Sequence, residues 1–193
     1  TVMIKTLAAA SIAALMATGA QAAPEAYVLD PSHSQILFSY EHLGFSTTWG
    51  LFSGFDGQIQ FDQEDPANSS VTIELPTDSM ITGWDERKTH FMSDNFFNAE
   101  ESPVVTFTST GIEVTGDDTA TITGDLTING TTAPLVLDAQ LTSAGAHPME
   151  GKDWAGFTAT GTVLRSDYGL DMFAPAVSDE VELQISIEAM RAA

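Results

Sequence analysis

The sequence of 193 residues contains no cysteine. That absence excludes disulfide scaffolds, thiol catalysis and thiolate metal sites. Positive charge is also scarce, because 6 Lys and Arg stand against 27 Asp and Glu, which gives a formal net charge of −21. So few cations argue against a nucleic-acid partner and against electrostatic docking on anionic lipid headgroups.

Long apolar runs are missing as well, except at the beginning of the chain. Lys5 precedes the small, uncharged segment Leu7 to Gly19, and Ala20-Gln21-Ala22 follows it. A positive start, a short apolar centre and a small-x-small site are typical of a cleaved secretory signal peptide. The run is shorter than the roughly 20 residues that a membrane-spanning helix needs. We therefore predict a signal peptide at residues 1–22, a mature domain at residues 23–193 and a periplasmic location.

Most of the mature chain alternates between apolar and polar residues. This period of two, with many Thr, Val, Ile and Phe residues, is typical of half-buried β-strands. Strands are expected over residues 35–41, 57–62, 71–75, 104–108, 111–114, 119–128, 134–142, 154–165 and 180–189. Asn129-Gly130 predicts a tight hairpin. Because no long helix intervenes, the pattern predicts an all-β, antiparallel fold, either a sandwich or a closed barrel.

One segment, Thr82 to Met92, departs from this alternation. Thr82 stands three residues before Asp85, as in a capping box, and acidic residues precede Arg87 and Lys88 in the order that the helix dipole favours. The segment therefore predicts a short helix that acts as a lid or plug between two halves of the β domain.

The usual signatures of catalysis and of metal or phosphate binding are absent or weak. The sequence has neither a phosphate-binding loop nor a dinucleotide fingerprint. Asp30, His33 and Ser34 stand close together, but no nucleophile-elbow sequence accompanies them. The four histidines show no metal-ligand spacing. We expect no catalytic residue, no metal site and no cofactor.

Aromatic residues are crowded in the first half of the mature chain. The sequence has 11 Phe, 3 Trp and 3 Tyr, and a barrel of eight strands is just wide enough either to be filled by side chains or to hold one apolar ligand. Composition alone leaves both a plain aromatic core and a ligand pore open.

The order of short motifs distinguishes these alternatives. The motifs are LDPSHS (29–34), FSYEHLG (38–44), GLFSGF (50–55), SDNFF (93–97), PVVTFTS (103–109), GDLTING (124–130), RSDYG (165–169) and VSDEV (177–181). In this order they closely resemble the YceI family of periplasmic polyisoprenoid-binding proteins, over residues 26 to 188. The chain departs from the family pattern at Lys88, Asn98 and Ser102.

The resemblance implies an antiparallel, eight-stranded, lipocalin-like barrel with a short helical insertion. It also implies an apolar pore that holds a polyprenyl lipid or an isoprenoid quinone, so that the protein is a non-enzymatic carrier or store. The side chains that we expect to line the pore are Phe38, Tyr40, Phe45, Phe52, Phe55, Phe91, Phe96, Phe97, Phe107, Phe157 and Leu164. The candidates for contact with a polar headgroup are Asp30, His33, His42, Arg87 and Arg165.

Several alternatives stay open at this point. Arg165 could instead form an internal ion pair with Asp167 or with a carboxylate on a neighbouring strand. The protein could be a small outer-membrane barrel, or a periplasmic hydrolase that uses His33, His42 or an Asp on a lipid ester or pyrophosphate. Transient membrane contact and either a monomer or a homodimer are compatible with the sequence.

Overall fold

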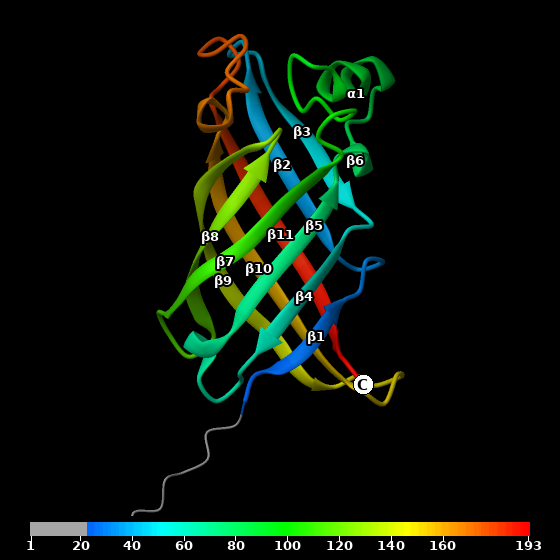
Figure 1. Ribbon diagram of the computed structural model, residues 1–193, viewed down its shortest axis with the longest axis vertical. Helices are drawn as coiled ribbons and strands as arrows, with labels where there is room; N and C mark the ends of the chain where they lie inside the picture. Colours follow the sequence, from blue (N-terminus) through cyan, green and yellow to red (C-terminus); the bar gives the residue numbers. More distant parts are fainter. Residues whose placement is uncertain (1–22) are drawn as a thin grey trace, which may run out of the picture.

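Antiparallel β-strands dominate the computed structural model, which describes residues 23–193 (Figure 1). The predicted signal peptide lies outside these residues. The strands are β1 (Glu25–Leu29), β2 (Gln35–His42), β3 (Ser46–Ser53), β4 (Asp56–Phe61), β5 (Ser70–Pro76), β6 (Met80–Ile81), β7 (Val104–Val114), β8 (Thr119–Ile128), β9 (Thr131–Ala146), β10 (Asp153–Leu164) and β11 (Glu180–Arg191). The helical elements of this part of the chain are α1 (Asp85–Met92) and the 3-10 turns η1 (Pro66–Asn68), η2 (Thr77–Ser79) and η3 (Arg165–Tyr168).

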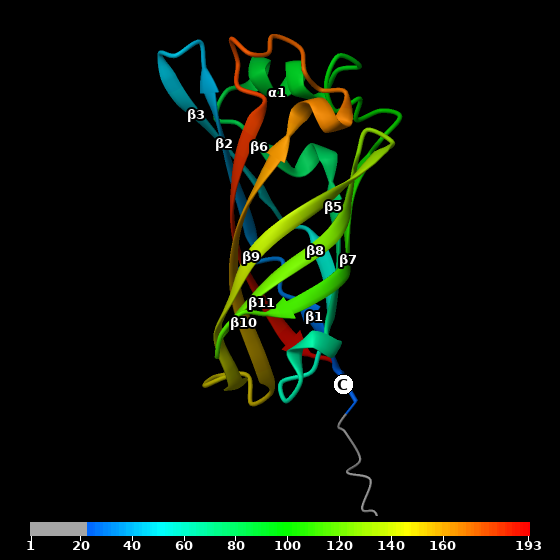
Figure 2. The same ribbon diagram turned by 90° about the vertical axis from the view of Figure 1, so that its left-hand side faces the viewer.

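The sheet closes into a barrel through one extra pairing. Its strand order is β1-β4-β5-β7-β8-β9-β10-β11-β2-β3-β6, and β1 also pairs with β11. The first eight strands of this order, which begin with β1 and end with β11, therefore form a closed ring. This confirms the predicted eight-stranded antiparallel barrel. Strands β2, β3 and β6 continue beyond the ring and extend the wall toward the end of the barrel where α1 lies (Figures 1 and 2).

A break between β1 and β2 makes this arrangement possible. β1 pairs with residues 189–191 of β11, and β2 pairs with residues 182–186 of the same strand. At the break, the fully buried Ser34 donates its hydroxyl to the carbonyl oxygen of Glu188 and accepts the Glu188 backbone N–H. The Ser34 side chain thereby supplies a hydrogen-bond partner for the Glu188 backbone N–H, which the interrupted strand pairing leaves without one.

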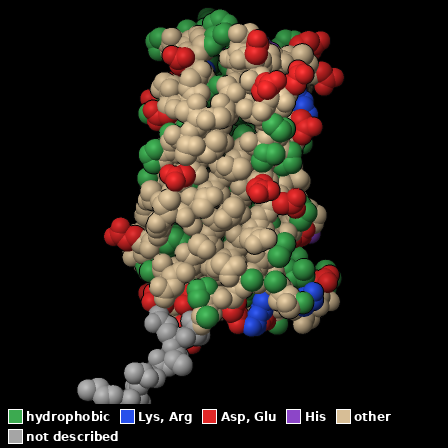
Figure 3. All heavy atoms as spheres, viewed as in Figure 1, with side chains coloured by type: hydrophobic (Ala, Val, Ile, Leu, Met, Phe, Trp, Pro, Cys, Tyr) green, Lys and Arg blue, Asp and Glu red, His purple; other side chains and the backbone are tan. Residues whose placement is uncertain are grey.

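Alternation along the strands places apolar side chains inside the ring and polar ones outside. In β11, Val181, Leu183, Ile185 and Ile187 face the interior, whereas the intervening side chains Glu182 and Gln184 are exposed. Because the period of a strand is two, one face of each strand supplies the interior wall. The outer face is correspondingly polar, and Asp and Glu are scattered over it (Figure 3).

Most of the predicted strands are confirmed, and β8 has the predicted bounds. The two segments predicted at residues 104–108 and 111–114 form one strand, β7, with a bulge between Ser109 and Gly111. Asn129 and Gly130 both have positive φ values, as a tight hairpin requires, but β9 begins at Thr131 rather than at Pro134. Strands β1, β3 and β6 are not among those expected from the sequence.

The helix is confirmed, but its capping was predicted wrongly. α1 begins at Asp85 with Trp84 as its N-cap, and no side chain caps it. Thr82 instead donates its hydroxyl to the carbonyl oxygen of Trp84 two residues later, so this side chain stabilises the turn that leads into the helix. None of the helices in residues 23–193 is long and apolar enough to cross a membrane.

Candidate functional site

The barrel encloses an apolar cavity with a volume of about 880 Å³. This volume lies in the upper part of the range of roughly 300–1,000 Å³ that is typical of small-molecule sites. Inward-facing side chains such as Ile36, Phe52, Leu183 and Ile185 line the cavity and are only half-buried. In a filled barrel these positions would be buried, so their remaining exposure reflects a hollow interior.

Aromatic rings connect the wall of the cavity to the helical segment at one end. Phe38 packs against Phe52 with 5.6 Å between ring centroids, and Phe52 contacts Phe97 at 6.5 Å. Tyr40 contacts Phe91 at 6.2 Å. The rings of the segment around α1 therefore pack against β2 and β3 and narrow this end of the cavity.

Small side chains create room further along the barrel. Ala120 on β8 is paired with Ala139 on β9, and Ala139 is paired with Ala159 on β10. All three line the cavity. A row of alanines across three neighbouring strands leaves space that leucine or phenylalanine would fill.

Nine of the eleven predicted pore residues line the cavity: Phe38, Tyr40, Phe52, Phe55, Phe91, Phe96, Phe97, Phe107 and Phe157. Their contact with a ligand stays a prediction. Phe55 is fully buried and Phe38, Phe96 and Phe107 are nearly so, whereas Phe157 is half-buried and forms an edge contact with Phe61 at 5.4 Å.

The expected placement of Phe45 and Leu164 in the pore is wrong. Phe45 follows the tight turn at Leu43 and Gly44, where both residues have positive φ, and its side chain is 89% exposed at the hairpin tip. Leu164 stands on β10 at an odd distance from Phe157, so it points to the opposite face, and it is 39% exposed.

Polar side chains line the cavity in two places. Ser69, Ser70, Asp117 and Asp118 line it near η1 and the turn between β7 and β8. The other polar group lies at the α1 end, which we call the mouth. His42, Glu86, Arg87 and His90 line the cavity there. The guanidinium group of Arg87 donates one hydrogen bond to the carbonyl oxygen of Thr82 and lies 5.7 Å from the centroid of the Trp84 ring. Its other N–H groups have no protein acceptor among the described residues, so Arg87 can donate to a headgroup.

Arg165 also lines the cavity, but its guanidinium group is already occupied. It donates to the carbonyl oxygens of Leu170, Met172, Val177 and Ser178 over 2.5–3.1 Å. These bonds hold the loop between η3 and β11 in place. Neither a headgroup contact nor the alternative of an ion pair with a carboxylate describes this arrangement.

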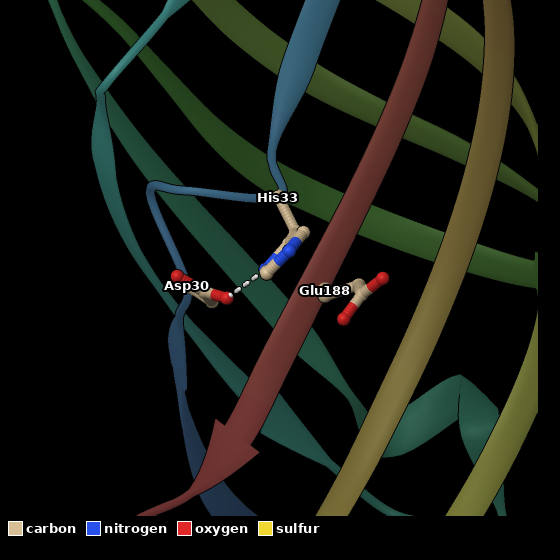
Figure 4. Close-up of side chains that lie close together, drawn as sticks. All are labelled: Asp30, His33 and Glu188. Atoms are coloured by element: carbon tan, nitrogen blue, oxygen red, sulfur yellow. Dashed lines mark hydrogen bonds and ion pairs between the residues drawn. The ribbon is translucent and has the colours of Figure 1, made fainter.

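Asp30 and His33 lie away from the cavity, on the outside of the barrel at the break between β1 and β2 (Figure 4). His33 Nδ1 is 2.6 Å from Asp30 Oδ2. This hydrogen bond raises the pKa of His33 above its usual value. Burial alone would raise the pKa of Asp30, but the hydrogen bonds from His33 and Ser32 outweigh it and lower that pKa. Their predicted placement near a headgroup is therefore wrong.

The same corner holds a group of potential metal ligands. Donor atoms of Asp30, His33 and Glu188 lie within 4.8 Å of one another. The His33 side chain is 65% exposed and its Nδ1 already bonds Asp30. Asp30 and His33 therefore form a surface pair beside the break, and the Glu188 carboxylate adds a second negative charge close to the His33 ring.

Aliphatic residues that were not among the expected lining residues form much of the wall. They include Ile59, Ile73, Leu75, Val105, Leu126, Leu135, Leu137 and Val163. The signal that could have found them is the alternation itself, because each strand's apolar face supplies the wall. Tyr168, also missed, is buried against the cavity, and this burial raises the pKa of its phenol to about 12, so the side chain stays neutral.

Comparisons with known proteins agree with this geometry. The BcnA structure from Burkholderia cenocepacia superposes with a TM-score of 0.74 at 22% identity, covering 83% of this chain and 98% of BcnA. A polyisoprenoid binding domain from Saccharophagus degradans superposes with a TM-score of 0.62 at 16% identity, covering 87% of this chain and 99% of that domain. These two likenesses support the barrel fold.

The sequence comparisons identify the family in addition to the fold. Protein YceI of Escherichia coli O17:K52:H18 is 38% identical over 191 residues, which are 98% of this chain and 99% of that protein. The family model of the YceI-like domain matches residues 27–189. The chain therefore belongs to the YceI family.

Proposed function

We propose that the protein binds a long-chain isoprenoid lipid, either a polyprenyl lipid or an isoprenoid quinone, as a non-enzymatic carrier or store in the periplasm. The observation that carries the proposal is the hollow interior: an apolar cavity of about 880 Å³ inside a closed barrel. A solved neighbour with the same fold is described as a polyisoprenoid binding domain, which supports the choice of ligand class.

The shape and chemistry of the cavity suit a flexible apolar tail. The wall is made of aromatic rings and branched aliphatic side chains from all around the barrel, so a tail can bind without leaving polar groups unsatisfied. A tail of roughly 40 carbons, at about 0.3 kcal/mol per heavy atom, would gain on the order of 12 kcal/mol, which corresponds to nanomolar affinity.

The polar end of such a lipid would lie at the mouth. Arg87 offers N–H donors, and His90 stands beside it on α1 with its ring 4.8 Å from that of Phe96. A quinone carbonyl or a phosphate could accept from Arg87. This arrangement supports a lipid whose headgroup is held at the α1 end while its tail extends into the barrel.

The geometry favours binding over catalysis. Ser32, His33 and Asp30 form a serine–histidine–aspartate group, but the Ser32 hydroxyl oxygen (3.1 Å) and the Asp30 carboxylate (2.6 Å) both approach Nδ1 of the same ring. A catalytic triad needs the two partners on different nitrogens. The group also lies outside the cavity, so it does not support a hydrolase that uses His33.

The polar outer wall also argues against the outer-membrane alternative. Strands of a membrane barrel place apolar residues outward and polar residues inward. Here the order is reversed, with Thr160, Thr162 and Glu182 outside and apolar side chains inside. Release of the mature protein by osmotic shock would agree with the periplasm and contradict a membrane barrel.

A cavity-filling substitution tests the proposal. Ala159→Phe places a ring in the cavity, whereas Thr160→Phe places the same ring on the outside of the same strand. Purified proteins would be compared by native mass spectrometry, followed by lipid extraction. We expect the parent chain and Thr160→Phe each to carry one isoprenoid lipid per protein molecule. In Ala159→Phe the lipid-bound fraction of the protein should fall by at least nine-tenths. No bound or exchangeable lipid in the parent chain would contradict the proposal.

A further inference from the structure

The α1 end of the barrel exposes large apolar side chains around the mouth of the cavity. We define the apolar rim as Leu43, Phe45, Trp84 and Phe173. Phe45 is 89% exposed, Phe173 59%, Trp84 57% and Leu43 50%. Trp84 and Phe173 also line the cavity, so the rim is continuous with the apolar interior.

The rim is assembled from three segments that are connected to one another. The backbone N–H of Leu43 at the hairpin tip donates to the carbonyl oxygen of Ala176, over 2.8 Å, and His42 forms a β-bridge with Val177. The rings of Tyr40 and Phe91 connect the same hairpin to α1. The three segments that carry the rim residues therefore lie together at one end of the molecule (Figure 2).

Two of the rim residues adopt an unusual backbone conformation. Leu43 has φ of 55° and Phe173 has φ of 68°, in the left-handed region that bulky side chains rarely occupy. Backbone hydrogen bonds of turns hold both conformations: the N–H of Phe45 donates to the carbonyl oxygen of His42 over 3.0 Å, and the N–H of Val177 donates to that of Phe173 over 2.9 Å. The turns therefore fix Leu43 and Phe173 at the surface, where both side chains are at least half exposed.

We propose that the apolar rim docks on the surface of a lipid bilayer, so that the mouth opens directly onto it. This inference rests on the proposed function, because an isoprenoid tail that passes between bilayer and cavity at this contact avoids exposure to water. Aromatic and leucine side chains are the residues that insert at the boundary between headgroups and acyl chains.

Charge favours a bilayer over a second copy of the chain. Two copies would each bring a formal charge of −21 to the contact, whereas a bilayer of neutral lipids brings none. The same charge predicts that anionic lipids weaken the docking, although Arg87 and Lys88 lie beside Trp84 on α1. The rim thus binds by apolar insertion and not by electrostatic attraction.

Flotation with phosphatidylcholine vesicles tests the proposal, using protein that begins at Ala23 so that the segment Leu7 to Gly19 contributes no binding. Leu43→Ser combined with Phe45→Ser is the test variant, because neither side chain lines the cavity. Met149→Ser is the control, because Met149 is 85% exposed in the loop between β9 and β10 at the opposite end. We expect the vesicle partition coefficient to fall at least tenfold in the double variant and to change less than twofold in the control.

Further measurements separate this proposal from the proposed function. Equilibrium binding of a detergent-dispersed isoprenoid should be unchanged in the double variant, whereas a parent chain that binds no lipid contradicts the proposed function instead. Three results would overturn the docking proposal. They are a parent chain that binds no vesicles, a control variant that loses as much vesicle binding as the double variant, and vesicle binding that increases with the fraction of anionic lipid. A rim-dependent dimer in sedimentation experiments, without vesicle binding, would also overturn it.

Discussion

Single glycines make room for the aromatic rings that line the barrel. A Cβ atom at Gly50 would lie 2.1 Å from Cζ of Phe38, and one at Gly124 would lie 2.3 Å from Cζ of Phe107. Each ring lies across a neighbouring strand where a side chain is missing. The glycine and the ring therefore act as a unit, and the ring covers backbone that would otherwise face the cavity.

Gly124→Ala should destabilise the barrel by about 1–3 kcal/mol, because the new methyl group meets the Phe107 ring and, at 2.7 Å, the carbonyl oxygen of Thr108. Urea unfolding measures the loss. Gly111→Ala on the adjacent strand is the matched control, because nothing lies within 4 Å of its added Cβ, and it should change the free energy of unfolding by less than about 0.5 kcal/mol. Equal losses in the two variants would contradict this account.

At the scale of whole elements, strands were predictable wherever alternation is complete in the sequence. β8 alternates without interruption, and its bounds were predicted as the structure has them. β3 was missed because its inward positions Ser46, Thr48 and Gly50 are polar or small. The ring of Phe38 on β2 supplies the apolar surface over Gly50. The apolar residue at this position of the wall therefore belongs to β2 and not to the sequence of β3.

The same reasoning explains which part of the site was predictable. Aromatic residues in the family motifs identified much of the lining. Leu164 was placed on the wrong face although alternation along β10 already separates it from Phe157 at an odd spacing. The placement of Asp30 and His33 outside the barrel depends on the break between β1 and β2 and on the shared pairing with β11. Such long-range pairing is set by the closed sheet and not by the local sequence.

The break between β1 and β2 should make stability depend on pH. The pKa of His33 is raised above 6.5, so its contribution is complete below pH 6.5 and is lost as the pH rises through the raised value. The pKa of Asp30 is lowered below 3.8, so its contribution is complete above pH 3.8 and is lost as the pH falls through the lowered value. The pair therefore stabilises the fold most in the window between these two ordinary values.

His33→Ala tests this prediction through urea midpoints measured across the pH range. The difference between the parent chain and the variant should be largest at about pH 5 and should shrink toward zero as the pH rises well above 6.5, because the raised pKa is then exceeded. His33→Gln is the control, since an amide can donate to Asp30 without titrating, and its difference from the parent should not follow the same curve. A constant difference for His33→Ala would mean that the ion pair does not contribute.

At the scale of the whole molecule, the two ends of the barrel differ in what they contribute to stability and to ligand binding. The closing pairs, such as Arg191 with Glu25 and Asp153, lie at the end opposite α1. The α1 end carries the mouth, and α1 itself contains no buried residue. One end is therefore fixed by the sheet, while the other is covered by a helix that contributes little to the core.

This division predicts that removing the lipid lowers stability without unfolding the barrel. A ligand that binds only the folded state stabilises it by RT ln(1 + [L]/Kd), or about 2.7 kcal/mol at a hundredfold excess over Kd. For a chain of this size such a change shifts Tm by about 5–11 °C. Differential scanning calorimetry of the delipidated and reloaded protein measures the shift.

Ala159→Phe separates this effect from other consequences of delipidation. Its added ring occupies the space that the tail would take, so its Tm should not change when lipid is removed or added. Thr160→Phe, with the ring outside, should keep the full shift of the parent chain. The added lipid and the new ring cannot occupy the same volume. If added lipid raises the Tm of Ala159→Phe as much as that of Thr160→Phe, the lipid therefore stabilises the protein from a site other than the cavity.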